Sequence, residues 1–294
     1  MFKYTNCPVC KKTDFRDFIS CKDYTVSMET FTIQECTSCN FKFTNPIPNV
    51  NDLGTYYKSE DYISHSNTKK GLISRLYHIV RNYTLKKKIS LVLGYVSRGT
   101  LLDYGSGTGM FLKACKEAGW KVYGMEPDNG ARKIAEEMDI TISPDKQDLE
   151  NIIKNGELSA ITLWHVLEHV TDLDITLDFF RNKLDKDGVL IIAVPNYKSY
   201  DARHYREYWA AYDVPRHLYH FEKATMELLL NNFGFNLVET KPMQFDSFYV
   251  SMLSEKYKTG SINYFTAFWN GLRSNMAAKS SADYSSVIYV FKKR

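Results

Sequence analysis

The stretch TLLDYGSGTG, residues 100–109, decides the fold of this chain. An apolar run at 100–104 is followed at once by glycines at positions 105, 107 and 109, and then by a helical pattern through Lys116. Glycines let a turn come close to a ligand, and the start of the next helix offers free backbone N–H groups. The stretch therefore predicts a buried strand, a ligand-binding turn and a helix, with a nucleotide-like cofactor at the turn.

Apolar runs and helical patterns alternate along the rest of the chain. Further strands are expected at 121–126, 160–163, 188–196, 235–240 and 287–291, and further helices at 171–184 and 223–232. This alternation implies a parallel, doubly wound α/β sheet. In such a sheet, ligands lie beyond the carboxyl ends of the strands.

Two acidic residues narrow the choice of cofactor. Asp103 ends the first strand two residues before Gly105, and the glycine spacing departs from the GxGxxG pattern of dinucleotide-binding turns. Glu126 ends the second strand about twenty residues downstream, a spacing that lets a carboxylate accept both hydroxyls of a ribose. The glycine turn alone would suit NAD as well as another nucleotide, and Asp103 decides against NAD.

Residues 103–109 resemble motif I (D-x-G-x-G-x-G) of class I S-adenosylmethionine (SAM) methyltransferases, and the resemblance extends over residues 72–294. It implies SAM as cofactor and a Rossmann-like sheet of seven strands, in which 160–163 is the fourth strand and the last strand is antiparallel. The residues that the resemblance places around SAM are Asp103, Gly105, Ser106, Gly107, Gly109, Glu126, Pro127, Leu163, Trp164 and His165.

Four cysteines near the start form two CxxC pairs: Cys7, Cys10, Cys36 and Cys39. Each CxxC turn directs two thiolates toward one ion, and two such turns complete a tetrahedral zinc site that leaves no position for water. We therefore expect a structural zinc ion in a zinc ribbon. The alternatives are four unrelated buried cysteines or a redox pair. Cys21 and Cys115 lack a partner at ligand spacing and are expected in the core.

These patterns divide the chain into three parts. Residues 1–48 are expected to form the zinc-ribbon module, 49–98 a linker with a helical cap, and 99–294 the methyltransferase domain. The cap contains an amphipathic helical pattern at 72–93. The aromatic-rich insertion at 244–285 exceeds the hairpin that the core fold needs, which suggests a helical lid, an oligomer contact or added core packing.

His165, Glu168 and His169 follow the fourth strand and therefore face the reactive end of the cofactor. The HxxEH string formally matches an inverted zinc-protease motif, but that motif needs a long helix. It also resembles the E-x-x-E-H stretch of ubiquinone-pathway O-methyltransferases, which bind a divalent cation there, although His165 replaces a glutamate. A third interpretation makes His169, or else His165, a general base. In the fourth, these side chains only pack or cap.

A second polar cluster, DVPRHLYHF at 213–221, resembles the D-x-P-R-H-x-x-H-F segment of a broad subgroup of these methyltransferases. Arg216 is a candidate clamp for a phosphate or carboxylate of the substrate. His217 is a candidate catalytic base, and Asp213 and His220 are candidate substrate contacts. A structural salt bridge between Asp213 and Arg216 is the alternative.

Composition limits the partners. Lys and Arg (38) exceed Asp and Glu (34) by only four, which is weak support for nucleic-acid binding. No apolar stretch is long enough to cross a bilayer and no signal-peptide core begins the chain, so a cytoplasmic protein is expected. A homo-oligomer stays open.

Three functions compete. The leading one is a small-molecule methyltransferase, because the ribbon-plus-methyltransferase layout resembles bacterial enzymes that modify sugars or sugar nucleotides. The alternative is an RNA methyltransferase whose zinc ribbon binds RNA, against which stand the low net charge and the acidic residues of the ribbon. A non-catalytic module that keeps SAM as a structural ligand is the third.

Overall fold

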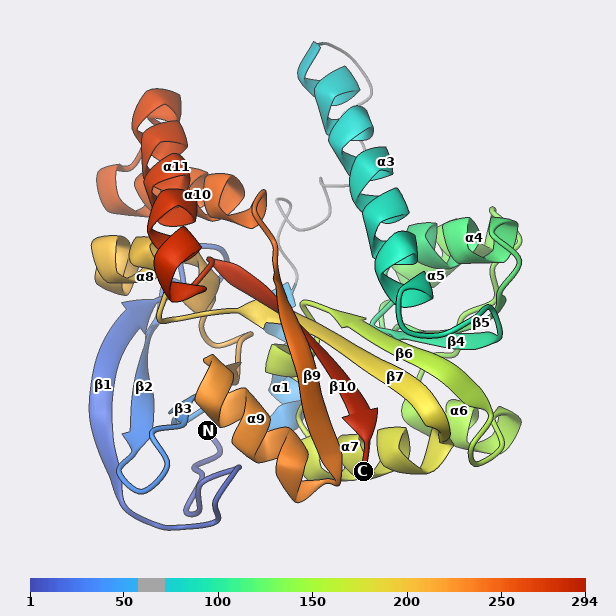
Figure 1. Cartoon of the computed structure of the whole chain (residues 1–294). Helices are drawn as coiled ribbons and strands as arrows, with labels where there is room; N and C mark the ends of the chain where they lie inside the picture. The colour runs from blue at the N-terminus through green and yellow to red at the C-terminus, as the bar shows by residue number, and fades with distance from the viewer. Residues whose placement is uncertain (58–71) are drawn as a thin grey trace.

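The computed structural model describes residues 1–57 and 72–294 (Figure 1). Part of the expected linker, residues 58–71, lies outside the described residues. The described chain forms a large α/β layer structure and a smaller sheet beside it. No helix in these two ranges is long and apolar enough to cross a membrane.

The large sheet has six strands within the described residues. In spatial order they are β5 (Lys121–Met125), β4 (Thr100–Tyr104), β6 (Leu158–Trp164), β7 (Leu184–Pro195), β10 (Ser286–Lys293) and β9 (Phe235–Pro242). The first four run parallel, whereas β10 is antiparallel to both of its neighbours, as expected for the last strand. The α/β sheet predicted from the sequence is therefore confirmed, with one strand fewer than expected.

The missing strand corresponds to the edge beside β5. There, Met125 and Ser143 form only an isolated parallel bridge. The backbone N–H of Ser143 donates to the Gly124 carbonyl, and the Ser143 carbonyl accepts from Glu126. Asp145 is the next residue whose backbone would face β5, but it is the N-cap of the helix Lys146–Ile152, so the ladder ends at this bridge.

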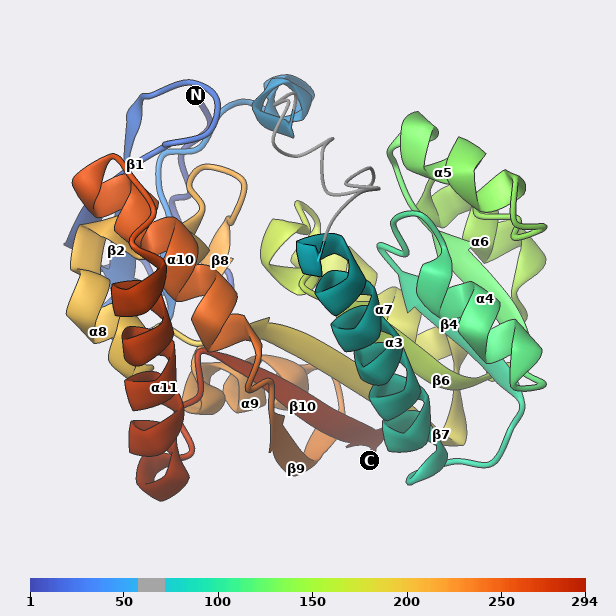
Figure 2. The same ribbon diagram turned by 90° about the horizontal axis from the view of Figure 1, so that it is seen from above.

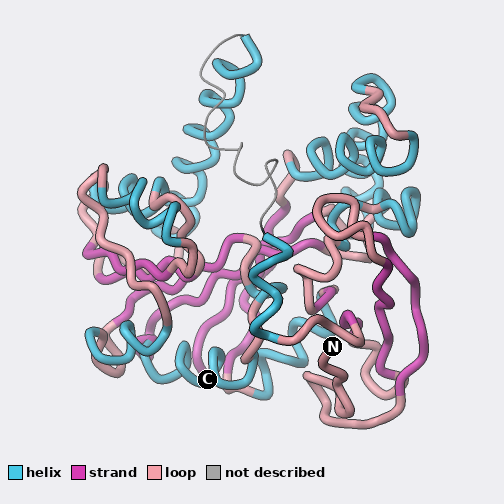
Figure 3. The backbone as a smooth tube through the Cα atoms, turned by 180° about the vertical axis from the view of Figure 1, so that it is seen from behind, coloured by secondary structure: helices cyan, strands magenta, loops and turns pink. Residues whose placement is uncertain are grey.

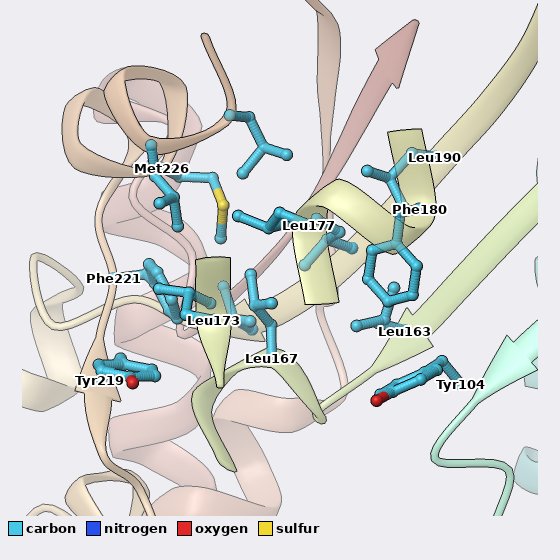
Figure 4. Close-up of a cluster of buried hydrophobic side chains, with 14 of the residues drawn as sticks. Tyr104, Leu163, Leu167, Leu173, Leu177, Phe180, Leu190, Tyr219, Phe221 and Met226 are labelled. Carbon is cyan, nitrogen blue, oxygen red and sulfur yellow. The ribbon is translucent and has the colours of Figure 1, made fainter. Parts of the chain in front are cut away.

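Helices cover both faces of the large sheet (Figure 1). One face carries α3 (Leu72–Leu93), α4 (Met110–Glu117) and α5 (Asn129–Glu136), and the other carries α6 (Lys146–Ile152), α7 (Leu173–Lys183) and α9 (Lys223–Asn232). Figure 4 shows the second core, where Leu177 and Phe180 of α7 pack on Leu163 and Leu190 of the sheet. These two apolar cores fix the ends of β4 and β6, where the candidate site lies.

The smaller sheet joins the N-terminal region to a distant segment. Its order is β1 (Phe15–Lys22), β2 (Thr30–Cys36), β3 (Lys42–Thr44) and β8 (Tyr219–His220), and α1 (Val50–Leu53) with the 3-10 turn η1 (Gly54–Tyr57) follows. Cys7 and Phe41 share one apolar core with Phe221. Seen from behind in Figure 3, this sheet lies next to the main layer. The DVPRHLYHF segment is thus held by the N-terminal strands.

The 244–285 insertion is helical. It forms α10 (Asp246–Thr259) and α11 (Tyr264–Ser281), which pack on α8 (Tyr200–Tyr205), η3 (Arg206–Tyr208) and η4 (Ala210–Tyr212). Figure 2 shows α10 and α11 at one end of the sheet, α4 and α5 at the other, and α3 between them. Tyr264, Phe265 and Phe268 are exposed on α11. Whether the insertion acts as a lid or as an oligomer contact stays a prediction.

Candidate functional site

The glycine turn follows β4 as the sequence predicts. Gly105 has φ +77°, and a Cβ atom there would lie 2.4 Å from Cγ2 of Val166, so no larger side chain fits. Gly109, at φ +75°, is the N-cap of α4. The backbone N–H groups of Gly105, Ser106, Gly107 and Gly109 already donate inside the protein, so the first turn of α4 is what offers free N–H groups to a ligand.

Two carboxylates lie at neighbouring strand ends. Asp103 on β4 is buried and accepts a 2.6 Å hydrogen bond from Oγ1 of Thr162. Burial raises the pKa of Asp103 to about 7, although Thr162 and Lys88 oppose the shift. Glu126 follows β5, and its carboxylate accepts from the backbone N–H of Gly107 at 2.9 Å and of Asp128 at 3.0 Å. Asp103 is thus shielded from solvent, whereas Glu126 is hydrogen-bonded to the glycine turn.

The structure brings the expected cofactor residues together at one edge of the sheet. Ser106 donates to the Met125 carbonyl at the end of β5, and Pro127 is exposed just beyond it. At the end of β6, Leu163 is fully buried, whereas Trp164 packs edge-on against Phe111 of α4. The ends of β4, β5 and β6 therefore form one continuous candidate cofactor site.

His165 leaves the strand in a left-handed conformation, with φ +59°. Its Nε2 lies 2.9 Å from Oδ2 of Asp246 on α10, and its Nδ1 lies 3.5 Å from Oε1 of Glu168. Burial disfavours the charged imidazole, but these two carboxylates outweigh it and raise the pKa of His165 to about 10. His165 is therefore cationic at neutral pH, which does not suit the predicted role of general base.

His169 belongs to a separate group with Glu168 and His217. Only a short 3-10 turn, η2 (Leu167–His169), follows β6, so the helical face considered for the HxxEH string does not form. One ligand atom from each of Glu168, His169 and His217 lies within 4.8 Å of the others. His165 is absent from this group, because Asp246 holds it.

The hydrogen bonds of the two imidazoles assign their tautomers. Nδ1 of His169 lies 3.0 Å from the Arg216 carbonyl, and Nδ1 of His217 lies 2.9 Å from the Ala211 carbonyl. A carbonyl only accepts, so both Nδ1 atoms carry a proton, and in a neutral His169 the free lone pair is on Nε2. Burial and the neighbouring His217 lower the pKa of His169 to about 4. His169 is therefore neutral at neutral pH and able to accept a proton.

Glu168 is the carboxylate of the group that it forms with His169 and His217. It is completely buried, and neither carboxylate oxygen has a hydrogen-bond partner among the described residues. Burial opposes ionisation, but His165 and the neighbouring histidines lower the pKa of Glu168. A buried carboxylate beside two imidazoles can either accept a proton relayed from them or help to hold a cation.

Arg216 is fully engaged inside the protein. Its guanidinium makes five hydrogen bonds: two to Asp213, two to Asp23 and one to the Tyr56 carbonyl. Only 3% of the residue is exposed. This geometry supports the structural salt bridge with Asp213 over the predicted substrate clamp.

His220 is buried in β8 rather than at the strand ends. Its Nε2 lies 3.1 Å from Oγ1 of Thr44, and its ring packs edge-on against Tyr212. Burial holds the pKa of His220 well below its usual range. The structure therefore places this predicted substrate contact in the packing between the two sheets.

The four cysteines converge as their spacing predicts. Sγ of Cys7 lies 3.6 Å from that of Cys39, Sγ of Cys10 lies 3.5 Å from that of Cys36, and all four lie within 4.8 Å of one another. A tetrahedral zinc ion with Zn–S bonds of about 2.3 Å requires sulfur separations of about 3.8 Å. The donor set fits zinc. Cys21 and Cys115 are buried elsewhere, as expected.

Four residues that sequence reasoning did not assign also reach these sites: Asp23, Tyr57, Lys88 and Asp246. Tyr57 lies 3.0 Å from Nδ1 of His169 through its hydroxyl, and Nζ of Lys88 lies 4.2 Å from the ring centre of Trp164. Asp23 and Asp246 are far in sequence from the residues that they hold. No local motif marks any of the four.

A family model described as a methyltransferase domain matches residues 77–240. A ubiquinone biosynthesis O-methyltransferase from Actinobacillus pleuropneumoniae is 27% identical over 169 residues, which cover 53% of this chain and 72% of that protein. The region that the family model matches contains the glycine turn, both acids at the strand ends and the histidine cluster.

Solved structures share the fold. A SAM-dependent methyltransferase from Archaeoglobus fulgidus superposes with a TM-score of 0.50 at 18% identity, covering 72% of this chain and 94% of that one. Magnesium protoporphyrin IX methyltransferase from Synechocystis, solved with bound S-adenosylhomocysteine (SAH), gives 0.51 at 14% identity, covering 81% and 97%. At these identities the likeness concerns the fold.

Proposed function

The chain belongs to the methyltransferase-domain family and is a SAM-dependent methyltransferase, and on that premise we propose that its acceptor is a small molecule of the sugar or sugar-nucleotide class. The acceptor carries a hydroxyl or an acidic C–H. The relative from Actinobacillus is by name an O-methyltransferase, which supports a hydroxyl. The ribbon-plus-methyltransferase layout supports the sugar class.

The strand ends suit SAM as cofactor. When bound, SAM supplies an electrophilic methyl group on a sulfonium sulfur. Glu126 would accept hydrogen bonds from its ribose, and the turn that begins at Gly105 lies open to close approach. Asp103 and Trp164 occupy the two strand ends beyond that turn. These residues position the methyl group, and positioning supplies much of the catalysis in a transfer of this kind.

One observation carries the proposal for the base: Nδ1 of His169 lies 3.0 Å from the Arg216 carbonyl, which leaves Nε2 to take up a proton, and His169 belongs to the cluster beyond the end of β6. In the proposed reaction, the acceptor oxygen or carbon bonds to the methyl carbon as the S–CH3 bond breaks, and the acceptor proton passes to Nε2 of His169. SAH and the protonated imidazole result. His217 lies beside His169, with ring centres 4.6 Å apart, and is the second candidate.

A cation at Glu168, His169 and His217 is the alternative chemistry for the same group. Two imidazoles and one carboxylate resemble the ligand sets that zinc, iron and manganese prefer, whereas magnesium prefers oxygen. Both histidines donate Nδ1–H to a carbonyl, which is the usual orientation of a metal ligand. Such a cation would lower the pKa of an acceptor hydroxyl without a protein base.

The four-cysteine site supports a second, separate proposal of a structural zinc ion. Burial raises the pKa of Cys7 to about 11 and also raises that of Cys39, so these two thiols need a cation nearby to ionise. Because four free thiols persist in a reducing compartment, a cytoplasmic location accompanies this proposal.

Radiolabelled SAM tests the acceptor class directly. The full chain is incubated with a panel of nucleotide sugars and, separately, with total RNA, and label is counted in each fraction after separation from SAM. We expect label in a nucleotide sugar. Label in RNA alone would replace the proposal with the RNA methyltransferase, and tight SAM binding with no transfer to any acceptor would support a non-catalytic module.

A further inference from the structure

Thr44 lies where the N-terminal sheet meets the main domain. It is the last residue of β3 and is completely buried. Its Oγ1 donates a 2.7 Å hydrogen bond to the His217 carbonyl, and its backbone N–H donates to the Leu218 carbonyl at 2.9 Å. Nε2 of His220 lies 3.1 Å from the same Oγ1 and donates to it, because the carbonyl already takes the single hydroxyl proton. Thr44 thus binds the backbone of residues 217–218 at two points.

The other side of this segment contacts the proposed base. The Arg216 carbonyl accepts from Nδ1 of His169 at 3.0 Å, and the backbone N–H of Leu218 donates to the Glu168 carbonyl at 2.8 Å. His169 and Glu168 both belong to η2. Residues 216–218 therefore form a backbone bridge between Thr44 on one side and η2 on the other.

The regular strand pairing does not reach this bridge. β8 has only two residues, and its ladder with β3 ends at the pair Phe43 and Tyr219. The hydrogen bonds of Thr44 continue the connection to residues 217–218. A buried carbonyl that loses its donor is costly, so without the Thr44 hydroxyl the backbone at His217 would shift toward another donor. The Arg216 carbonyl belongs to the preceding peptide group and would move with it.

We propose that Thr44 positions the imidazole of His169 for proton transfer. This inference rests on His169 being the base of the proposed reaction. The hydroxyl fixes the His217 carbonyl, the planar peptide group transmits that constraint to the Arg216 carbonyl, and the Arg216 carbonyl orients His169. Thr44 is thus a positioning residue, and the N-terminal sheet is part of the methyltransferase site rather than a separate binding module.

Thr44→Val tests this role, because it removes the hydroxyl and keeps a side chain of similar shape. The rate is measured in a single turnover with radiolabelled SAM and the nucleotide sugar that the acceptor panel identifies. A small displacement of a base slows proton transfer, so we expect a rate about 10–100-fold lower with SAH affinity unchanged. Thr44→Ser restores the hydroxyl and should recover most of the rate. Thr44→Ala, which also lacks the hydroxyl, provides the same comparison if Thr44→Val does not fold.

A second measurement needs no acceptor. In protein with ¹⁵N-labelled histidine, the exchange of the His169 Nδ1–H with water reports how firmly the Arg216 carbonyl holds it. We expect this exchange to be about tenfold faster in Thr44→Val, a change that corresponds to the loss of one hydrogen bond. Thr32→Val is the matched control for both measurements, because Oγ1 of Thr32 shares a 3.2 Å hydrogen bond with Oγ of Ser20 within the same sheet.

The double variant Thr44→Val/His169→Ala separates positioning from general damage. With no imidazole left to position, Thr44→Val should lower the rate of His169→Ala no further. A further loss in the double variant would overturn the proposal, and so would a wild-type rate and exchange in Thr44→Val or a parallel loss of SAH affinity. If His169→Ala kept a near-normal rate, the proposed base would fail instead, and the exchange measurement would still show whether Thr44 holds the imidazole.

Discussion

Oγ1 of Thr162 donates a 2.6 Å hydrogen bond to Oδ1 of Asp103, and so joins β6 to β4 beneath the glycine turn. No other hydrogen bond to this carboxylate occurs among the described residues. One donor does not replace the hydration that burial removes, so the pKa of Asp103 rises to about 7. Asp103 thus keeps its proton to a higher pH than an ordinary aspartate.

The raised pKa of Asp103 predicts a specific pH dependence of stability. The folded protein holds this proton more tightly than the unfolded chain, whose aspartates titrate near pH 3.9, so stability falls as pH rises from about 4 to about 7. Asp103→Asn cannot ionise and lacks this fall. Between pH 5 and pH 8, the unfolding free energy of the variant should therefore gain about 2–3 kcal/mol relative to wild type. Urea unfolding at both pH values measures it, and Asp178→Asn, an exposed position on α7, should show no such gain.

Glu126→Ala should weaken SAH binding. The variant removes the proposed acceptor for two ribose hydroxyls, and losing hydrogen bonds to a charged group costs about 1.5–3 kcal/mol, or about tenfold or more in affinity. Calorimetry measures the change. Glu137→Ala, at an exposed position just after α5, is the control and should bind SAH like wild type. Equal affinity in Glu126→Ala would show that another residue binds the ribose.

The four-cysteine site predicts one tightly held zinc ion per chain. Elemental analysis of protein purified without added metal should find it, and the double variant Cys7→Ala/Cys36→Ala should lack it because two ligands cannot close a tetrahedral site. Cys115→Ala, a buried cysteine in the other core, should keep the metal. Stoichiometric zinc in the double variant would exclude these cysteines as its ligands.

Much of the fold could be predicted from the sequence because its signals are local. The apolar run of β4, the glycines after it and the acid that follows β5 each lie within a few residues of what they specify. The seventh strand does not form because Asp145 begins α6 and leaves the edge pairing at a single bridge. The joining of β3 to β8 could not be predicted either, since it pairs residues that are far apart in the chain.

The candidate site could be predicted only in part, for a physical reason. The histidines were identified, but their chemical states depend on partners from other elements. Asp246 stabilises the protonated form of His165, and the Arg216 carbonyl fixes the tautomer of His169. Arg216 itself was expected at the substrate, whereas Asp23 from the loop after β1 takes up its free donors.

Arg216→Gln tests whether that arginine is structural. The change leaves Asp23 and Asp213 without their counter-charge, and breaking a buried ion pair in this way costs about 3–5 kcal/mol. We expect a large loss of unfolding free energy in urea, together with similar losses for Asp23→Asn. Arg203→Gln, which is exposed on α8, should change little. A stable Arg216→Gln protein with a raised acceptor KM would restore the role of substrate clamp.

His169→Ala tests the proposed base. Nδ1 of His169 donates to the Arg216 carbonyl, so only Nε2 can take the acceptor proton, and alanine leaves nothing at that position. Loss of a general base typically lowers the rate about 10²–10⁴-fold, whereas SAH binding should stay intact because the cofactor residues lie on the strand ends. Single-turnover transfer from radiolabelled SAM measures the rate, and His204→Ala on α8 should be close to wild type.

The metal content of the same variants separates the base from a bound cation. If a cation occupies Glu168, His169 and His217, wild-type protein carries two metal equivalents. His217→Ala then loses this cation and keeps the cysteine-bound zinc. The Cys7→Ala/Cys36→Ala variant loses the zinc and keeps the cation. If His169 acts as a base alone, wild type and His217→Ala both carry the single zinc of the cysteine site, and added Mn²⁺ or Zn²⁺ does not raise the rate. Metal analysis of these variants distinguishes the two sites, whereas a chelator would remove metal from both. Near-normal turnover in the double variant His169→Ala/His217→Ala would exclude the base and the cation together, because each mechanism requires at least one of these imidazoles.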